Sequence, residues 1–301
     1  MSAGSMASTA VQGILTKHRI IWNYIEVLKP RETGLLVFIG VVTAIVASAG
    51  SLPINQLVFA LIAILFASAG ANGLTNYLDR EVDARMVRTR HRALPSRRIY
   101  PPEKVLPLTI GLTLAGLGLA WQLHPLAFLV DLTGTTAAVV WRKRVTCVFP
   151  QGAIASCAPV LMGWFAARTD FAWEIILLCV LIAVWLPSHI WSIMVAHRDD
   201  YLNAGINYFP VNRNVKTVTK ILLAFCVLLY AASIGLYFVG NFGVLYLVVA
   251  NVLGIAVVYA SVRLVRAKSF DAAWKLYKLS AFPYLGLLFL VMWLDIWLLV
   301  V

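Results

Sequence analysis

Charge is scarce in this sequence of 301 residues. Only 13% of the residues are Asp, Glu, Lys or Arg, whereas 61% are hydrophobic. A water-soluble globular domain carries about twice that share of charged residues, so the composition excludes one. Cysteine is scarce as well, because the four cysteines form no CxxC pair, which speaks against a disulfide framework or a zinc site. The sequence therefore predicts an integral membrane protein with buried, apolar cysteines.

Long uncharged runs divide the chain. Residues 33–78, 145–167, 175–197 and 221–262 contain no Asp, Glu, Lys or Arg, and residues 105–141 contain only Asp131. Each run holds one or two stretches of about 20 residues, the length that crosses a bilayer. No polar and apolar alternation typical of a barrel is present, so we expect an all-α, polytopic membrane helix bundle. Turn-like breaks give nine transmembrane helices, over residues 33–50, 56–78, 104–121, 126–141, 150–167, 172–196, 218–239, 242–263 and 279–300.

The basic residues show which side of the membrane each loop occupies. With these nine helices, every Lys and Arg except Arg168 falls on one side. The positive-inside rule then predicts a multi-pass protein of the cell membrane with a cytoplasmic N-terminus. The net charge of +12 is spread between apolar runs, so we exclude nucleic acid as a partner and name the lipid bilayer. Residues 1–20 read as a flexible tail, and residues 21–28 as either an interfacial helix or an extension of the first span.

Two carboxylates and two amides share one helix face where the second span ends. At about 100° per residue, Asn72, Asn76, Asp79 and Asp83 fall within roughly 60° of arc. Carboxylates one turn apart repel each other unless a cation lies between them. Oxygen ligands of this kind suit Mg²⁺ bridging a carboxylate to a phosphate.

Arginines follow this face directly, at Arg85, Arg88, Arg90 and Arg92. Their charge would neutralise the remaining phosphate oxygens. The alternative is that the whole loop is a positive-inside anchor with i,i+4 pairing. That alternative explains the arginines but explains the carboxylates and amides on one face poorly.

A second polar loop follows the sixth span, which contains His189 two residues after Pro187. His197 and the pair Asp199-Asp200 come next. His189 would share a broad face with His197 if the helix persists. Two interpretations stay open: His189 binds a ligand, or it satisfies a buried polar group in the core.

These residues resemble the UbiA-type intramembrane prenyltransferases, and within them the protoheme IX farnesyltransferase (heme O synthase) branch. Residues 76–96 are similar to the family's first aspartate motif, and the similarity covers residues 24–295. Supporting matches are Leu28-Lys29-Pro30-Arg31, Pro159, Gly163-Trp164, Trp185, Pro187, His189, Asp200-Tyr201, Ala204-Gly205-Ile206 and Pro210.

The resemblance implies a reaction and a set of roles. The reaction is transfer of a farnesyl group from farnesyl diphosphate to a vinyl group of protoheme IX, giving heme O, with Mg²⁺ as cofactor. The implied domain is residues 21–301, with cytoplasmic loops 79–104 and 197–217 capping the active site. A downstream heme-modifying membrane enzyme is a candidate partner. The implied roles are catalysis by Asn76, Asp79 and Asp83; metal binding by Asp79, Asp83 and Asp200; diphosphate binding by Asn72, Arg88, Arg90, Arg92 and Lys143; and acceptor binding by Trp185, His189, His197, Asp200 and Tyr201.

Several positions depart from the family pattern, at Glu81, His91, Ala93, Ser188 and Asn207. They bear on the acceptor more than on the fold. The rival acceptors are a chlorophyllide, a quinone precursor and a lipid headgroup. A transporter is a more distant alternative, because Asp131 lies inside a span, but no internal repeat accompanies it.

Overall fold

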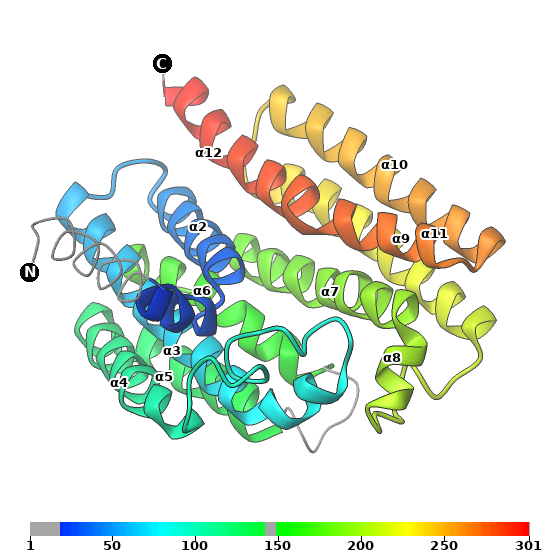
Figure 1. Ribbon diagram of the computed structural model, residues 1–301. Helices are drawn as coiled ribbons and strands as arrows, with labels where there is room; N and C mark the ends of the chain where they lie inside the picture. Colours follow the sequence, from blue (N-terminus) through cyan, green and yellow to red (C-terminus); the bar gives the residue numbers. More distant parts are fainter. Residues whose placement is uncertain (1–18, 142–148, 301) are drawn as a thin grey trace, which may run out of the picture.

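The computed structural model describes residues 19–141 and 149–300, which form helices and turns with no strand (Figure 1). A short helix over residues 19–27 comes first. The helices that follow are α2 (Pro30–Ala47), α3 (Ile54–Arg85), η1 (Pro102–Val105), α4 (Leu106–Leu123), α5 (Pro125–Thr136), η2 (Ala137–Trp141), α6 (Gln151–Ala167), α7 (Trp173–Ala196), α8 (Arg198–Asn203), α9 (Val215–Val239), α10 (Val244–Ala267), α11 (Phe270–Leu279), η3 (Ser280–Gly286) and α12 (Leu287–Val300).

The prediction of a polytopic, all-α membrane bundle is confirmed. Within the described residues, seven helical stretches are long and apolar enough to cross a membrane, and Pro125–Val139 and Gln151–Ala167 are shorter apolar helices. All nine predicted spans coincide with an apolar helix, but a count of nine spans stays a prediction for the two shorter ones. Large apolar side chains such as Leu114, Phe238 and Val252 lie exposed on the outside, as suits a bundle surrounded by lipid.

The helices form a closed ring. Neighbours along the chain pack side by side from α2 to α7 and from α9 to α12, and α12 returns to contact α2. Figure 1 shows α2 to α6 gathered on one side, α9 to α12 on the other, and α7 between the two groups. Because α7 contacts α6, α9 and α11, its residues can meet partners from both groups.

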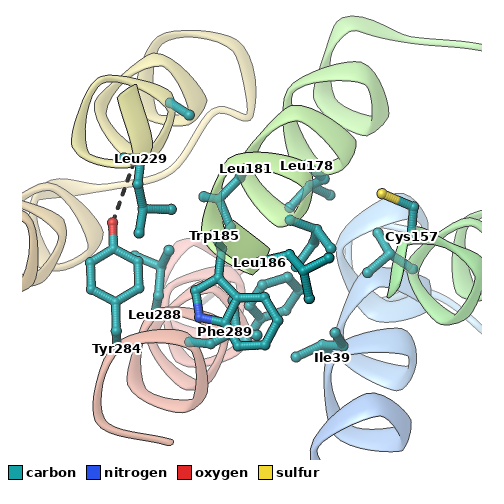
Figure 2. Packing of buried hydrophobic residues seen from close by; sticks show 14 of the residues in the cluster. Ile39, Cys157, Leu178, Leu181, Trp185, Leu186, Leu229, Tyr284, Leu288 and Phe289 are labelled. Carbon is teal, nitrogen blue, oxygen red and sulfur yellow. Dashed lines mark hydrogen bonds between the residues drawn. The ribbon is translucent and has the colours of Figure 1, made fainter. Parts of the chain in front are cut away.

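The core lies where these groups meet (Figure 2). Trp185 and Leu186 of α7 pack beside Ile39 of α2 and Phe289 of α12, and all four are buried. The hydroxyl of Tyr284 donates to the carbonyl of Leu229, 3.4 Å away. Since apolar side chains gain little by leaving lipid, tight packing and hydrogen bonds of this kind hold the bundle together.

Glycines allow two helix pairs to approach closely. A Cβ built on Gly163 of α6 would lie 1.9 Å from the carbonyl oxygen of Gly40 on α2. A Cβ on Gly70 of α3 would lie 2.4 Å from the side-chain oxygen of Thr113 on α4. Small residues bring the helix backbones into contact here, so larger ones would separate α2 from α6 and α3 from α4.

Two predicted boundaries are wrong by more than five residues. The second span was expected to end at residue 78, but α3 continues to Arg85, so the first part of the expected loop 79–104 is helical. The final helix was expected over 279–300, yet the helical stretch begins at Phe270 and passes through the π-helix η3. Pro283 lies inside η3, and Ala281 leaves helical geometry at ψ −126°. Proline lacks the N–H that a regular helix needs, so the turn widens there.

The N-terminal boundary also shifts. Residues 1–18 of the expected tail lie outside the described residues, but residues 19 and 20 belong to the first short helix. That helix exposes Ile20, Ile21 and Trp22, as an interfacial helix would. Cys157 and Cys226 are buried, Cys179 is half-buried, and Cys147 lies outside the described residues.

Candidate active site

The polar face of α3 forms the floor of the candidate site. Because α3 runs without a break to Arg85, Asn72, Asn76, Asp79 and Asp83 do occupy successive turns of one helix. Asn76 and Asp83 are buried, each with 8% of its surface exposed, and Asn72 and Asp79 are half-buried. This face therefore turns into the protein where α3 ends.

Both amides on this face bind neighbouring backbone or hydroxyl groups. The side-chain nitrogen of Asn76 donates to the carbonyl of Val27 at 2.7 Å, and that of Asn72 donates to the hydroxyl of Thr33 at 2.9 Å. These bonds tie α3 to the start of α2 and to the N-terminal helix. Because each amide donates through its nitrogen, the side-chain oxygen of Asn76 is the atom that a cation could bind.

Asp83, the carboxylate closer to the loop, forms an ion pair with that loop. Arg92 donates to Oδ2 of Asp83 at 2.9 Å, and the hydroxyl of Thr89 donates to the Asp83 carbonyl at 3.0 Å. The loop therefore folds back over the end of α3. Arg88 and Arg92 are half-buried, whereas Arg90 is exposed.

Lys143, which was predicted to bind diphosphate, lies outside the described residues. A lysine that was given no role stands near the site instead. The ammonium of Lys29 donates to the hydroxyl of Thr75 at 3.2 Å, beside Asn76 on α3. The sequence already marked Lys29, because it belongs to the Lys-Pro-Arg stretch that resembles the family.

The N-terminal helix, residues 19–27, binds the loop that follows α3. Glu26 accepts the backbone N–H of Ala93 at 3.0 Å and pairs with Arg98 at 2.6 Å. Asn23 accepts a second bond from the Arg98 guanidinium at 2.7 Å. Sequence reasoning missed Glu26, because nothing local connects residue 26 with residue 93.

The two polar loops meet at Asp200 on α8. Its Oδ1 accepts the N–H of Val87 at 2.7 Å, and its Oδ2 accepts the N–H of Arg88 at 3.1 Å. The guanidinium of Arg88 in turn donates to the hydroxyl of Tyr201 at 3.2 Å. Loops 79–104 and 197–217 are thus in direct contact.

His189 is held in a stack of rings between α7 and α11. Its imidazole stacks on Trp185 with 5.0 Å between centroids and on Tyr277 with 4.5 Å. Its Nδ1 lies 3.0 Å from the hydroxyl of Ser280. That hydroxyl also donates to the Tyr277 carbonyl at 3.0 Å; in the Nδ1–H tautomer it would accept from His189, and Nε2 would then carry the lone pair.

His197 lies at the end of the same stack. Its ring meets the rings of Phe270 and Trp274 edge-on, with centroids 5.3 and 5.6 Å apart. Burial lowers the pKa of His197; Arg88 lowers it further, while Asp200 raises it. Because α7 persists to Ala196, His189 and His197 both face α11. The α11 residues Trp274 and Tyr277 were not predicted, since only the fold brings them to α7.

The donors on α3 fit a magnesium ion in type. They are oxygens from two carboxylates and one amide, and Mg²⁺ usually keeps water and substrate phosphate as its other ligands. In the part of the chain that the structure describes, no three His, Cys, Asp or Glu side chains gather as a metal cluster. Two carboxylates and one amide would make up only part of a Mg²⁺ coordination shell, which water or a phosphate would complete.

The sequence of the chain matches a known family model over residues 35–299, that of the UbiA prenyltransferase family. The chain belongs to this family. Proteins named protoheme IX farnesyltransferase are among its relatives. The one from Desulforudis audaxviator is 38% identical over 91% of this chain and 88% of the relative. The one from Symbiobacterium thermophilum is 32% identical over 94% of this chain and 96% of the relative.

Solved structures of the UbiA family share the fold. A structure of digeranylgeranylglyceryl phosphate synthase superposes with a TM-score of 0.75 at 16% identity, covering 92% of this chain and 98% of the other. A UbiA homolog from Archaeoglobus fulgidus, bound to GPP and Mg²⁺, superposes with a TM-score of 0.62 at 15% identity, covering 90% of this chain and 99% of the other. At these identities the likeness establishes the UbiA fold for this chain.

Proposed function

We propose that this UbiA-family protein transfers a farnesyl group from farnesyl diphosphate to a vinyl group of protoheme IX, giving heme O. In this reaction the C–O bond of the allylic diphosphate breaks and its electron pair leaves with diphosphate. The farnesyl carbon bonds to the terminal vinyl carbon, and water supplies the hydroxyl on the neighbouring carbon and releases a proton. The observation that carries the proposal is the α3 face of Asp79 and Asp83 beneath an arginine-bearing loop.

The roles follow from where the side chains lie. Asp79, Asp83 and the oxygen of Asn76 would hold Mg²⁺, which when bound withdraws charge from the departing diphosphate. Arg88 and Arg92 would bind the diphosphate oxygens, with Lys29 as an additional cation near α3. Arg90, Asn72 and Lys143 remain proposed diphosphate residues, although Arg90 is exposed and Asn72 already bonds Thr33.

The acceptor side is proposed at α7. Flat stacked rings at Trp185, His189 and Tyr277 suit a planar macrocycle, and the Nε2 lone pair of His189 suits heme iron. His197 and Tyr201 would border this side, where the loops meet. The relatives that match nearly the whole chain are named protoheme IX farnesyltransferase, which supports the same acceptor.

One assay tests the function. Purified protein is incubated with protoheme, farnesyl diphosphate and Mg²⁺, and the hemes are separated by chromatography. We expect a farnesylated heme in the complete mixture and none after chelation of Mg²⁺. Parallel reactions offer a chlorophyllide, a quinone precursor or a lipid headgroup in place of protoheme. Prenylation of one of these with no product from protoheme would replace the proposed acceptor.

The orientation is proposed as well. We place the protein in the cell membrane with its N-terminus and both polar loops in the cytoplasm, and with a downstream heme-modifying membrane enzyme as a partner that takes up the product. Single cysteines near Ser96 and Asn212, in a cysteine-free background, should both react with an impermeant thiol reagent from the cytoplasmic side only. Labelling of the two positions from opposite sides would overturn this topology.

A further inference from the structure

Both carboxylate oxygens of Asp200 accept hydrogen bonds from the turn that follows α3. Oδ1 accepts from Val87 N–H at 2.7 Å and Oδ2 from Arg88 N–H at 3.1 Å. The two amides are successive along the backbone, so the carboxylate binds them side by side. Asp199, the neighbouring acid, is exposed. The position of Asp200, and not its charge alone, therefore decides what it binds.

The turn is closed by its own backbone at one point. Met86 leaves helical geometry with ψ 129°, and the N–H groups of Thr89 and Arg90 both bond back to its carbonyl. The N–H groups of residues 87 and 88 bond instead to Asp200, 113 residues away from Val87.

Arg88 is held on the same support. One guanidinium nitrogen donates to Tyr201 at 3.2 Å, and the guanidinium carbon lies 5.9 Å from the centre of the Tyr201 ring. Within the described residues, the buried Nε of Arg88 has no hydrogen-bond partner. A buried guanidinium N–H without a partner is one that an anion can satisfy.

We propose that Asp200 and Tyr201 form a latch that fixes the 86–90 turn and aims Arg88 at the diphosphate, so that Asp200 is a positioning residue and not a metal ligand. The contact with diphosphate rests on the proposed function; the latch itself does not. Each oxygen keeps a further lone-pair site, so the assignment rests on the two successive amides, whose charge-assisted hydrogen bonds hold the carboxylate against the 86–90 turn.

The first experiment is amide hydrogen exchange on the full-length protein without Mg²⁺ or substrate. Asp200→Asn keeps the size but places an NH₂ group against a backbone donor. We expect exchange at amides 87 and 88 to accelerate roughly tenfold or more, as the loss of charge-assisted hydrogen bonds implies. Asp199→Asn is the matched control and should exchange as the wild type does. Unchanged exchange in Asp200→Asn would overturn the latch, whatever the acceptor proves to be.

A second variant breaks the latch from the other side. Val87→Pro removes one donor and leaves the carboxylate intact. Proline suits this site because Val87 is exposed and occupies the second position of the turn closed by the Thr89 N–H to Met86 bond, and Met86 has the extended geometry that precedes proline. The amide of Arg88 should then exchange faster, even if Asp200→Asn does not fold.

Kinetics separate the latch from metal binding. In both variants we expect KM for farnesyl diphosphate to rise by roughly tenfold while the Mg²⁺ concentration for half-maximal activity stays near the wild-type value. Tyr201→Phe should raise the same KM by less, because it removes one of the Arg88 contacts. A selective loss of Mg²⁺ affinity in Asp200→Asn, with normal amide exchange, would show that Asp200 is a metal ligand after all.

Discussion

The two sides of the candidate site are built in different ways. The diphosphate side is one helix and the loop that directly follows it: Asn76, Asp79 and Asp83 on α3, then Arg88 and Arg92. The acceptor side is assembled from α7, α11 and η3, and the partners His189 and Ser280 are 91 residues apart. A local motif can be recognised from helical periodicity, whereas an assembled pocket depends on how distant helices pack.

This contrast predicts that damage to α3 is severe and specific. Asp83→Asn keeps the side-chain volume but removes the charge that pairs with Arg92 and that would face the proposed Mg²⁺. We expect turnover to fall on the order of 100-fold or more while the protein still folds. Heme chromatography measures turnover, and circular dichroism checks folding. Glu81→Gln, at an exposed carboxylate two residues away, is the control; equal losses in both variants would contradict a specific role for the α3 face.

The acceptor side should respond to a different substrate. His189→Ala is expected to raise KM for protoheme roughly tenfold, as about 1.4 kcal/mol of lost binding implies, and to leave KM for farnesyl diphosphate nearly unchanged. Repeating the comparison with metal-free porphyrin separates iron ligation from a propionate contact. If iron ligation is the role, wild type loses its advantage over the variant; if it is a propionate contact, the advantage remains.

An outcome of another kind would move His189 out of the site. If the variant loses thermal stability but shows the wild-type KM for both substrates, the imidazole serves only the packing between Trp185 and Tyr277. The candidate site would then consist almost wholly of residues on α3 and the loop that follows it.

Ser280 offers a finer test of the assembled side. Ser280→Ala removes the hydroxyl that bonds Nδ1 of His189 and leaves the backbone carbonyl that accepts from Trp185. We expect KM for protoheme to rise by roughly threefold, in keeping with one neutral hydrogen bond. The visible spectrum of the heme complex should report a change in axial ligation. An unchanged spectrum together with an unchanged KM would show that the tautomer of His189 is set elsewhere.

The smallest expected effect concerns the junction of the two sides. Burial lowers the pKa of His197 below its ordinary value of 6.5, so the folded protein resists protonation that the unfolded chain accepts. The resulting stability is complete above about pH 6.5 and falls as the pH drops below it. We expect the unfolding temperature in detergent to decrease slightly between pH 8 and pH 5.5, and to decrease less in His197→Gln. His91→Gln, at an exposed histidine, should behave as the wild type does.

The diphosphate face could be read from the sequence because its geometry is that of one helix. The arc from Asn72 to Asp83 depends only on helical periodicity, and α3 keeps that periodicity to Arg85. The span was ended at residue 78, seven residues before α3 ends, because the uncharged run stops before Asp79. Residues 79–85 are helical because their buried side, including Asp83, packs against the returning loop.

Several contacts of the site could not have been predicted. Glu26 binds Ala93, Tyr277 stacks on His189, and Asp200 binds the amides of residues 87 and 88. Each of these contacts joins segments that are far apart along the chain. Asp200 in particular looks like a metal ligand in a list of acids, and only its position against two backbone donors suggests another role.

The sequence by itself determined that the chain crosses a membrane as helices, because its apolar runs are long and every backbone group must be satisfied within lipid. It also determined which helix carries the carboxylates, since spacing along one helix is a local property. The tertiary structure alone decided which loops touch, which rings enclose His189 and which oxygens of Asp200 are already bound. Those features depend on the closure of the ring from α12 to α2 and on α7 lying between the two groups of helices, and no local pattern encodes either.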